Sequence, residues 1–170
     1  MRTQNVVVEK WNPKWEEEFE KIVESLGKEI IQNVIKIEHV GSTSVKGMSA
    51  KPIIDLDIVI ENDKFLILKK LLEDKGYVHE GDLGIRDREA FSYINKNDLM
   101  THHLYVCPKD SEELFKHITF RNYLRQHSEL VDEYSKVKEK AAVLFPDNID
   151  KYIEYKSGVI EKIYNQCGLL

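Results

Sequence analysis

Two aspartates one residue apart lie within an apolar segment that follows a turn of small residues. Asp55 and Asp57 stand in PIIDLDIVI, and Gly41-Ser42 stands in HVGSTS, with 12 residues between the two motifs. On a β-strand, residues two apart project from the same face, so both carboxylates point to one side. Mg²⁺ (or Mn²⁺) is the cation that suits such a pair, because one or two carboxylates and substrate phosphates commonly hold it. The alternative is a solvated pair of carboxylates that each contact Lys or Arg.

The Gly41-Ser42 turn has the chemistry of a phosphate-binding loop. Glycine lets backbone N–H groups approach an anion without interference from a Cβ, and serine adds a hydroxyl. On its own, Gly-Ser-Thr-Ser is also ordinary turn chemistry. The turn and the aspartate strand together favour a site for a nucleotide and a metal ion.

This block and four further segments resemble the GrpB family, a group within the nucleotidyltransferase-like superfamily. The further segments are GIRDREAF (84–91), HHLYV (102–106), FRNYLRQH (120–127) and YKSGVIEKI near the C-terminus. The resemblance implies an α+β fold: a nucleotidyltransferase-like mixed β-sheet with helices on one face and a C-terminal helical region. In that superfamily the Gly-Ser turn holds a nucleoside triphosphate, and the carboxylate strand holds the metal ions.

The segment MTHHLYVC departs from the superfamily pattern. Nucleotidyltransferases usually carry a third carboxylate on a later strand, and this segment contains no Asp or Glu. Strand alternation places His103 and Tyr105 on the aspartate side and His102 in the core. Tyr105 stands where the family has a second histidine, which argues against a strict two-histidine metal site, and His103 is expected to be a metal ligand or proton shuttle. The predicted catalytic and metal-binding residues are Asp55, Asp57 and His103.

Basic residues at positions that are basic in the family motifs are predicted to complete an anion site. Arginine suits bidentate phosphate recognition, and lysine suits point-charge contact. The alternative is a solvated charge or a structural ion pair, which we favour for Arg86 and Arg125. The predicted nucleotide- and phosphate-binding residues are Gly41, Ser42, Ser44, Lys51, Arg88, Arg121 and Lys156.

The elements that must position these residues follow from the apolar pattern. The β-branched run at 6–11 predicts an edge strand, and Asn12-Pro13 predicts the start of a helix whose apolar stripe runs from Trp15 to Ile30. Further strands are predicted at 34–40 and 52–60, a helix at 63–76, antiparallel strands between 77 and 107, and helices at 110–127, 129–144 and 148–165. We expect one domain over 1–170, with a sheet-containing core at 1–108 and a helical part at 109–170.

Composition limits the class of protein. The chain has 25 Lys+Arg against 30 Asp+Glu, and this acidic balance argues against broad binding to a nucleic-acid backbone. Cys107 and Cys167 belong to no zinc or C-x-x-C spacing, so we expect free thiols in a reducing compartment. No run approaches the ~20 apolar residues of a membrane span, and the first residues do not resemble a signal peptide. We therefore expect a soluble, cytoplasmic protein.

The sequence leaves three functions open. The first is a metal-dependent nucleotidyltransferase that uses a nucleoside triphosphate and an unknown acceptor, with a small molecule or protein favoured over nucleic acid. The second is a non-catalytic module that binds a nucleotide or another phospholigand, which the missing third carboxylate favours. The third is a hydrolase with a transition metal held by Asp55, Asp57 and His103.

Overall fold

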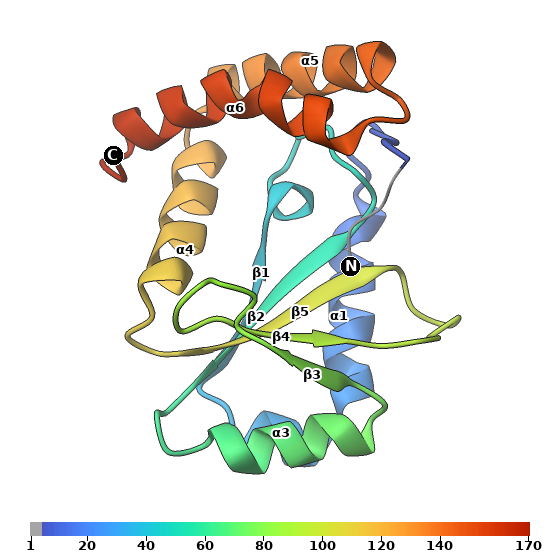
Figure 1. Ribbon diagram of the computed structural model, residues 1–170, viewed down its shortest axis with the longest axis vertical. Helices are drawn as coiled ribbons and strands as arrows, with labels where there is room; N and C mark the ends of the chain where they lie inside the picture. The colour runs from blue at the N-terminus through green and yellow to red at the C-terminus, as the bar shows by residue number, and fades with distance from the viewer. Residues whose placement is uncertain (1–4) are drawn as a thin grey trace.

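A five-stranded mixed β-sheet forms the centre of the protein, and helices pack on it and beyond one of its ends (Figure 1). The computed structural model describes residues 5–170, and residues 1–4 lie outside the described part. In chain order the elements are α1 (Lys14–Leu26), α2 (Lys28–Gln32), β1 (Lys36–Val40), the 3₁₀ turn η1 (Ser42–Ser44), β2 (Ile54–Ile60), α3 (Phe65–Asp74), β3 (Val78–Gly81), β4 (Glu89–Ser92), β5 (His102–Pro108), α4 (Glu112–Arg125), α5 (Ser128–Leu144) and α6 (Ile149–Gln166). The predicted α+β class, with a helical C-terminal region after the strands, is confirmed.

The strand order β1-β2-β5-β4-β3 places the two strands that carry the predicted chemistry side by side. β2 runs antiparallel to β1 and parallel to β5, and β4 runs antiparallel to both β5 and β3. In register, Asp55 lies beside His103 and Asp57 lies beside Tyr105. Directly paired residues share a face of the sheet, so these four side chains project from the same side.

The opposite face of the sheet is apolar and packs against α1, α2 and α3. Ile58 of β2 and Leu104 and Val106 of β5 lie there in one core cluster with residues of these helices. His102 also belongs to this core, because it is 3% exposed and its Nε2 lies 2.7 Å from the hydroxyl of Tyr77. The core position predicted for His102 is therefore confirmed.

α4 adds a helix to the face of the sheet that carries the aspartates. Leu114 of α4 joins Val59 and Cys107 in a small core cluster on that side. Since Val59 follows the aspartates by alternation along β2, α4 lies directly over their half of the sheet. This arrangement brings α4 side chains to the predicted site. Helices were expected on one face of the sheet only, so the position of α4 differs from that prediction.

The N-terminal segment differs from its prediction. Residues 6–11 form no strand, and only Glu9 makes an isolated antiparallel bridge, to Ala50. The next helix starts as predicted, since Asn12 Oδ1 accepts a hydrogen bond from the backbone N–H of Lys14 at 2.9 Å. The apolar stripe is divided between α1 and α2 by Gly27, whose φ of 85° is incompatible with a continuous helix.

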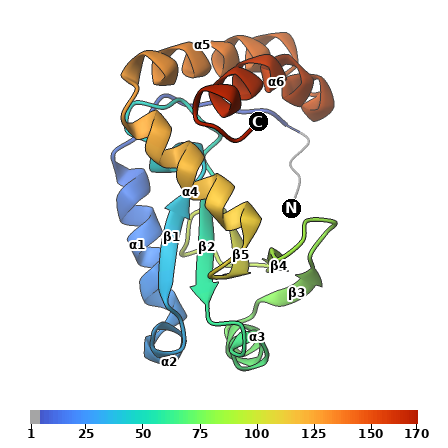
Figure 2. The ribbon, with the colours of Figure 1, turned by 90° about the vertical axis from the view of Figure 1, so that its left-hand side faces the viewer.

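α5 and α6 pack together beyond one end of the sheet, where they lie over the segment that joins β1 to β2 (Figure 2). Tyr134 of α5 and Val159 of α6 share a core cluster with Val45 and Met48 of that segment. The helical C-terminal part therefore covers the small-residue turn.

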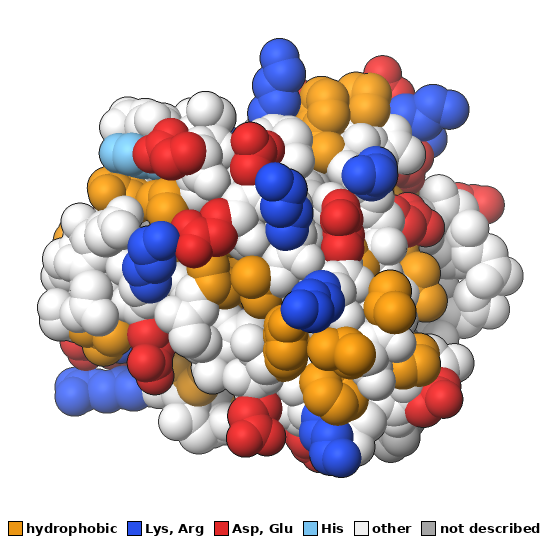
Figure 3. Space-filling view, turned by 90° about the horizontal axis from the view of Figure 1, so that it is seen from above, with side chains coloured by type: hydrophobic (Ala, Val, Ile, Leu, Met, Phe, Trp, Pro, Cys, Tyr) orange, Lys and Arg blue, Asp and Glu red, His pale blue; other side chains and the backbone are white. Residues whose placement is uncertain are grey.

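The outer surface of this helical end mixes charges of both signs (Figure 3). Lys and Arg side chains are interspersed with Asp and Glu, and the part of this face that the structure describes has no continuous basic area. None of the helices in residues 5–170 has the length and apolar character that crossing a bilayer requires. Cys107 and Cys167 are free thiols, as predicted.

Candidate functional site

The small-residue turn after β1 lies directly against the first aspartate of β2. Gly41 has φ 74°, and a Cβ added there would overlap Oδ2 of Asp55. Glycine is thus required both for the backbone conformation and for the close approach of the turn to the carboxylate. Gly41 and Asp55 line the same cavity, so the predicted proximity of turn and carboxylate strand is confirmed at this residue.

This cavity, which we call the lysine cavity, has a volume of about 270 Å³ and lies between the sheet, the turn, α5 and α6. It brings together these predicted site residues: Gly41, Ser42, Lys51, Asp55, His103 and Lys156. It also contains three side chains that did not stand out in the sequence: Tyr134, Lys138 and Tyr152. The turn, one carboxylate and basic residues from two distant helices therefore meet in one hollow.

Lys138 is the most deeply placed cation of the lysine cavity. Its side chain is almost fully buried, and its Nζ donates a hydrogen bond to Ser42 Oγ at 2.8 Å and lies 4.1 Å from the centre of the Tyr134 ring. Burial, with Lys156 and Lys51 as neighbouring cations, lowers the pKa of Lys138 well below its ordinary value. Burial and the neighbouring Lys51 lower the pKa of Lys156 to about 8, although Asp55 partly offsets them. Lys138 and Lys156 are thus buried beside other cations, an arrangement that an anion would stabilise.

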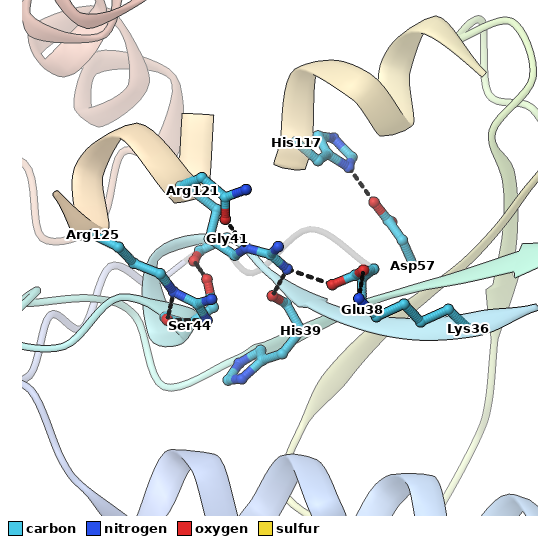
Figure 4. Close-up of polar contacts among 10 residues, drawn as sticks. Lys36, Glu38, His39, Gly41, Ser44, Asp57, His117, Arg121 and Arg125 are labelled. Atoms are coloured by element: carbon cyan, nitrogen blue, oxygen red, sulfur yellow. Dashed lines mark hydrogen bonds and ion pairs between the residues drawn. The ribbon is translucent and has the colours of Figure 1, made fainter. Parts of the chain in front are cut away.

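Asp57 lies outside the lysine cavity and is fully buried. Its Oδ2 accepts a hydrogen bond from Nδ1 of His117, on α4, at 2.6 Å (Figure 4). Its Oδ1 has no hydrogen-bond partner in the described structure. Burial raises the pKa of Asp57 above its ordinary value, and the contact with His117 opposes that effect. His117 is a functional candidate that strand and turn patterns could not indicate, because it belongs to a helix distant in sequence.

The neighbours of the two aspartates include a histidine and a glutamate that is already paired with two cations. His103 Nδ1 lies 3.0 Å from Asp55 Oδ1, so the predicted association of His103 with the pair is present. Glu38 of β1 is in register with Asp57, but its two oxygens are occupied by Lys36 at 2.8 Å and Arg121 at 2.6 Å. Within residues 5–170, no group of three or more His, Cys, Asp or Glu side chains is arranged to hold a metal ion.

Arg121 and Ser44 line a second, larger hollow of about 730 Å³ between α1, β1 and α4. Besides its ion pair with Glu38, buried Arg121 donates a hydrogen bond to the His39 carbonyl at 3.0 Å (Figure 4). Arg125 donates two hydrogen bonds to the Ser44 carbonyl, at 3.0 and 2.8 Å, which is a structural contact. Arg121 and Ser44, which were predicted to bind phosphate, do not line the lysine cavity.

Arg88 lies against Tyr105, the β5 residue in register with Asp57. Its guanidinium carbon is 4.3 Å from the centre of the Tyr105 ring, and its Nε has no hydrogen-bond partner in the described structure. Arg86, in the same loop, has a side chain that is 96% exposed. Arg88 therefore faces the aspartate side of the sheet, whereas Arg86 is a solvated charge.

The sequence matches the GrpB protein family over residues 5–166. The chain belongs to the GrpB family. It is 33% identical over 147 residues to the UPF0157 protein YqkA of Bacillus subtilis (strain 168), which covers 86% of this chain and 42% of YqkA. It is 30% identical over 156 residues to the Glutamate-rich protein GrpB of Alkalihalophilus pseudofirmus, which covers 89% of this chain and 90% of that protein. This GrpB chain thus spans less than half the length of YqkA but most of the other relative.

The similar solved structures include a GrpB protein and a more distant protein of similar fold. The crystal structure of the conserved protein GrpB from Enterococcus faecalis has a TM-score of 0.81 and 35% identity, over 95% of this chain and 96% of that one. Cid1 in complex with its short product ApU has a TM-score of 0.51 and 13% identity, over 76% of this chain and 40% of that one. The Cid1 poly(U) polymerase bound to MgATP has a TM-score of 0.52 and 12% identity, over 76% of this chain and 45% of that one. At such low identity these two matches show a shared fold, so this GrpB protein has a nucleotidyltransferase-like fold.

Proposed function

We propose that this GrpB protein is a metal-dependent nucleotidyltransferase that transfers a nucleotidyl group from a nucleoside triphosphate to a small-molecule or protein acceptor. The observation that carries the proposal is the lysine cavity, in which the Gly41-Ser42 turn, Asp55 and three lysines meet. The nucleotidyltransferase-like fold supports the proposal. The Gly-Ser turn and the aspartate strand of this chain stand where the superfamily motif has the turn that holds the triphosphate and the strand that holds the metal ions.

The lysine cavity supplies what a triphosphate requires. Lys51, Lys138 and Lys156 provide positive charge, and Ser42, which already accepts the Lys138 hydrogen bond, provides a hydroxyl beside the turn. Compact ammonium groups act as point charges toward phosphate oxygens. A bound triphosphate would also relieve the mutual repulsion of the three lysines. The triphosphate would therefore bind, and pyrophosphate would leave, at this end of the site.

Mg²⁺ (or Mn²⁺) fits the aspartates. Oxygen ligands suit these ions, which commonly use one or two carboxylates and complete their coordination with phosphates and water. The fully buried Oδ1 of Asp57, which lacks a partner, is an oxygen that a cation would satisfy. Asp55 and Asp57 would hold the ion, which would neutralise phosphate charge and activate an acceptor hydroxyl. His103 fixes Asp55 through their 3.0 Å contact.

The second candidate is a non-catalytic module that binds a nucleotide or another phospholigand. It is favoured by the absence of any carboxylate on β5 and by the ion pairs that occupy Glu38. In this case the lysine cavity would bind the anion, and no pyrophosphate would be released. The two candidates share the anion site and differ only in chemistry.

The test of the proposal is calorimetric titration of each nucleoside triphosphate with Mg²⁺, followed by assay of pyrophosphate. Lys138→Met should weaken triphosphate binding by about ten-fold or more, since it removes a charge-assisted hydrogen-bond donor worth roughly 1.5–3 kcal/mol. Lys140→Met is the matched control, because Lys140 is exposed on the same helix. Asp57→Asn should keep the fold and lose the Mg²⁺ dependence of binding.

Equal affinities of the Lys138 and Lys140 variants would remove the lysine cavity as the phosphate site. Unchanged Mg²⁺ dependence in Asp57→Asn would remove the metal role of Asp57. Tight binding without pyrophosphate release across a broad panel of acceptors would establish the module in place of the enzyme.

A further inference from the structure

Asp57 is held from α4 by a chain of two side chains. Its Oδ2 lies 2.6 Å from Nδ1 of His117, and Nε2 of His117 lies 3.3 Å from Oε1 of Glu113. His117 and Glu113 are four residues apart on α4 and therefore lie on one helical face. Both nitrogens of the imidazole ring are engaged, so two carboxylates fix the ring from opposite sides.

The contact divides the tasks of the two carboxylate oxygens. Oδ2 is engaged by His117, whereas Oδ1 has no partner although Asp57 is 0% exposed. An unsatisfied oxygen in an enclosed position costs free energy unless a ligand completes it. Because a carboxylate is planar, fixing Oδ2 also fixes the direction in which Oδ1 points.

The strand that carries the third carboxylate in most nucleotidyltransferases cannot stabilise this geometry. Tyr105, the β5 residue in register with Asp57, bears no negative charge to orient a cation or its ligand. Glu38, the register partner on β1, is occupied by Lys36 and Arg121. The support for Asp57 therefore comes from α4 and not from a neighbouring strand.

We infer that His117 is the positioning residue of the metal site: it holds Asp57 so that Oδ1 is presented to the divalent ion. The inference rests on the proposed function, in which Asp57 is a metal ligand. His117 itself touches neither the ion nor the substrate, and Glu113 keeps its ring in place. Hydrogen-bond partners of metal ligands typically change metal affinity about 10–100-fold when they are removed.

The experiment is a titration of the full chain with Mn²⁺ alone, in which electron paramagnetic resonance measures the free ion. Asparagine and glutamine separate the two ring nitrogens, since the amide of Asn replaces Nδ1 and the amide of Gln replaces Nε2. We expect His117→Asn to bind Mn²⁺ within about three-fold of the unmodified protein, because its amide can still donate to Asp57. We expect His117→Gln and His117→Leu to bind about 10–100-fold more weakly.

His79→Leu is the matched control. His79 also pairs with a carboxylate, Glu89 at 3.0 Å, and its side chain is 23% exposed against 24% for His117. Its loss should leave Mn²⁺ affinity unchanged. Circular dichroism of each variant separates a change in affinity from a loss of fold, and the Asn–Gln comparison remains informative even where the leucine variant unfolds.

The outcomes separate the inference from the proposed function. Mn²⁺ binding by the unmodified protein with equal affinity in His117→Gln, or an equal loss in the Asn and Gln variants, would overturn the positioning role and leave the metal site standing. Failure of the unmodified protein to bind Mn²⁺ would overturn both. Mn²⁺ binding that depends on His117, without release of pyrophosphate, would retain the inference for a binding module and remove the enzyme.

Discussion

Replacing Gly41 with alanine combines a backbone penalty with a collision at the candidate site. Gly41 has φ 74° and ψ −177°, a conformation that is nearly exclusive to glycine and costs other residues about 1–3 kcal/mol. The added methyl group would also overlap Oδ2 of Asp55, and over-packing of this kind typically costs about 1–3 kcal/mol. We therefore expect Gly41→Ala to lower the free energy of unfolding by about 2–6 kcal/mol.

The assay is urea denaturation, with triphosphate binding measured under conditions in which the variant is folded. Gly84→Ala is the matched control, because Gly84 also has a positive φ, of 85°, but nothing lies within 4 Å of the added Cβ. It should show the backbone cost alone, and its ligand binding should not change. In Gly41→Ala the turn or Asp55 must move, so triphosphate affinity should fall as well.

An Asp55→Ala background isolates the collision. Removing the carboxylate should reduce the cost of Gly41→Ala toward that of Gly84→Ala, since the overlap with Oδ2 is lost and only a tight contact of 3.2 Å with the Cβ of residue 55 remains beside the backbone penalty. If Gly41→Ala costs no more than Gly84→Ala in the unmodified background, the close approach of turn and carboxylate does not constrain the protein, and the reasoning is refuted.

Two further predictions concern buried charges. The pKa of Lys156 is lowered to about 8 by burial and Lys51, against 10.5 ordinarily, so the unfolded chain binds more protons between these values and the free energy of unfolding should rise with pH there. Lys156→Met should reduce that rise in urea denaturation, with Lys138 accounting for the part that remains, and parallel pH profiles for the two proteins would contradict the assignment. Arg121→Met leaves Glu38 without one of its two cations and should cost about 3–5 kcal/mol, as expected when one member of a buried ion pair is lost. Arg125→Met is the control, and an equal loss of stability in both variants would show that the Glu38 pair is not special.

Strand alternation and turn chemistry were sufficient to place part of the site. Both are local properties, so alternation placed His103 on the aspartate side, whereas the parallel pairing that sets Asp55 beside His103 became visible only in the structure. The proximity of the turn to the aspartate strand also followed from the motif, whereas the contact of Gly41 with Asp55 became visible only in the structure.

Side chains contributed by the C-terminal helices could not be found in the same way. Lys138 and His117 lie on helices that reach the site through tertiary packing, 96 residues from Ser42 and 60 residues from Asp57. A lysine on a charged helix such as α5 usually faces water, and no local pattern shows that α6 and the turn enclose it. Arg121 illustrates the converse, because its motif position indicated a phosphate contact whereas Glu38 and the His39 carbonyl engage it.

The predicted strand at 6–11 is absent because strand formation, like the helix contacts above, depends on partners that are distant in sequence. β-Branched residues favour an extended chain, but a strand also needs a partner with free backbone groups along several residues. Of residues 6–11, only Glu9 has a bridge partner, Ala50, so the segment does not form a strand.

β1 is an outer strand of the sheet, and its treatment has a consequence for self-association. Outer strands expose backbone groups that can recruit another chain, and proteins commonly block them with charged side chains. Arg121 occupies one backbone group of this strand, because its guanidinium donates a hydrogen bond to the His39 carbonyl and is paired with Glu38. A cation that the motif assigned to a ligand thus occupies a backbone acceptor of an outer strand, which leaves that acceptor unavailable to another chain.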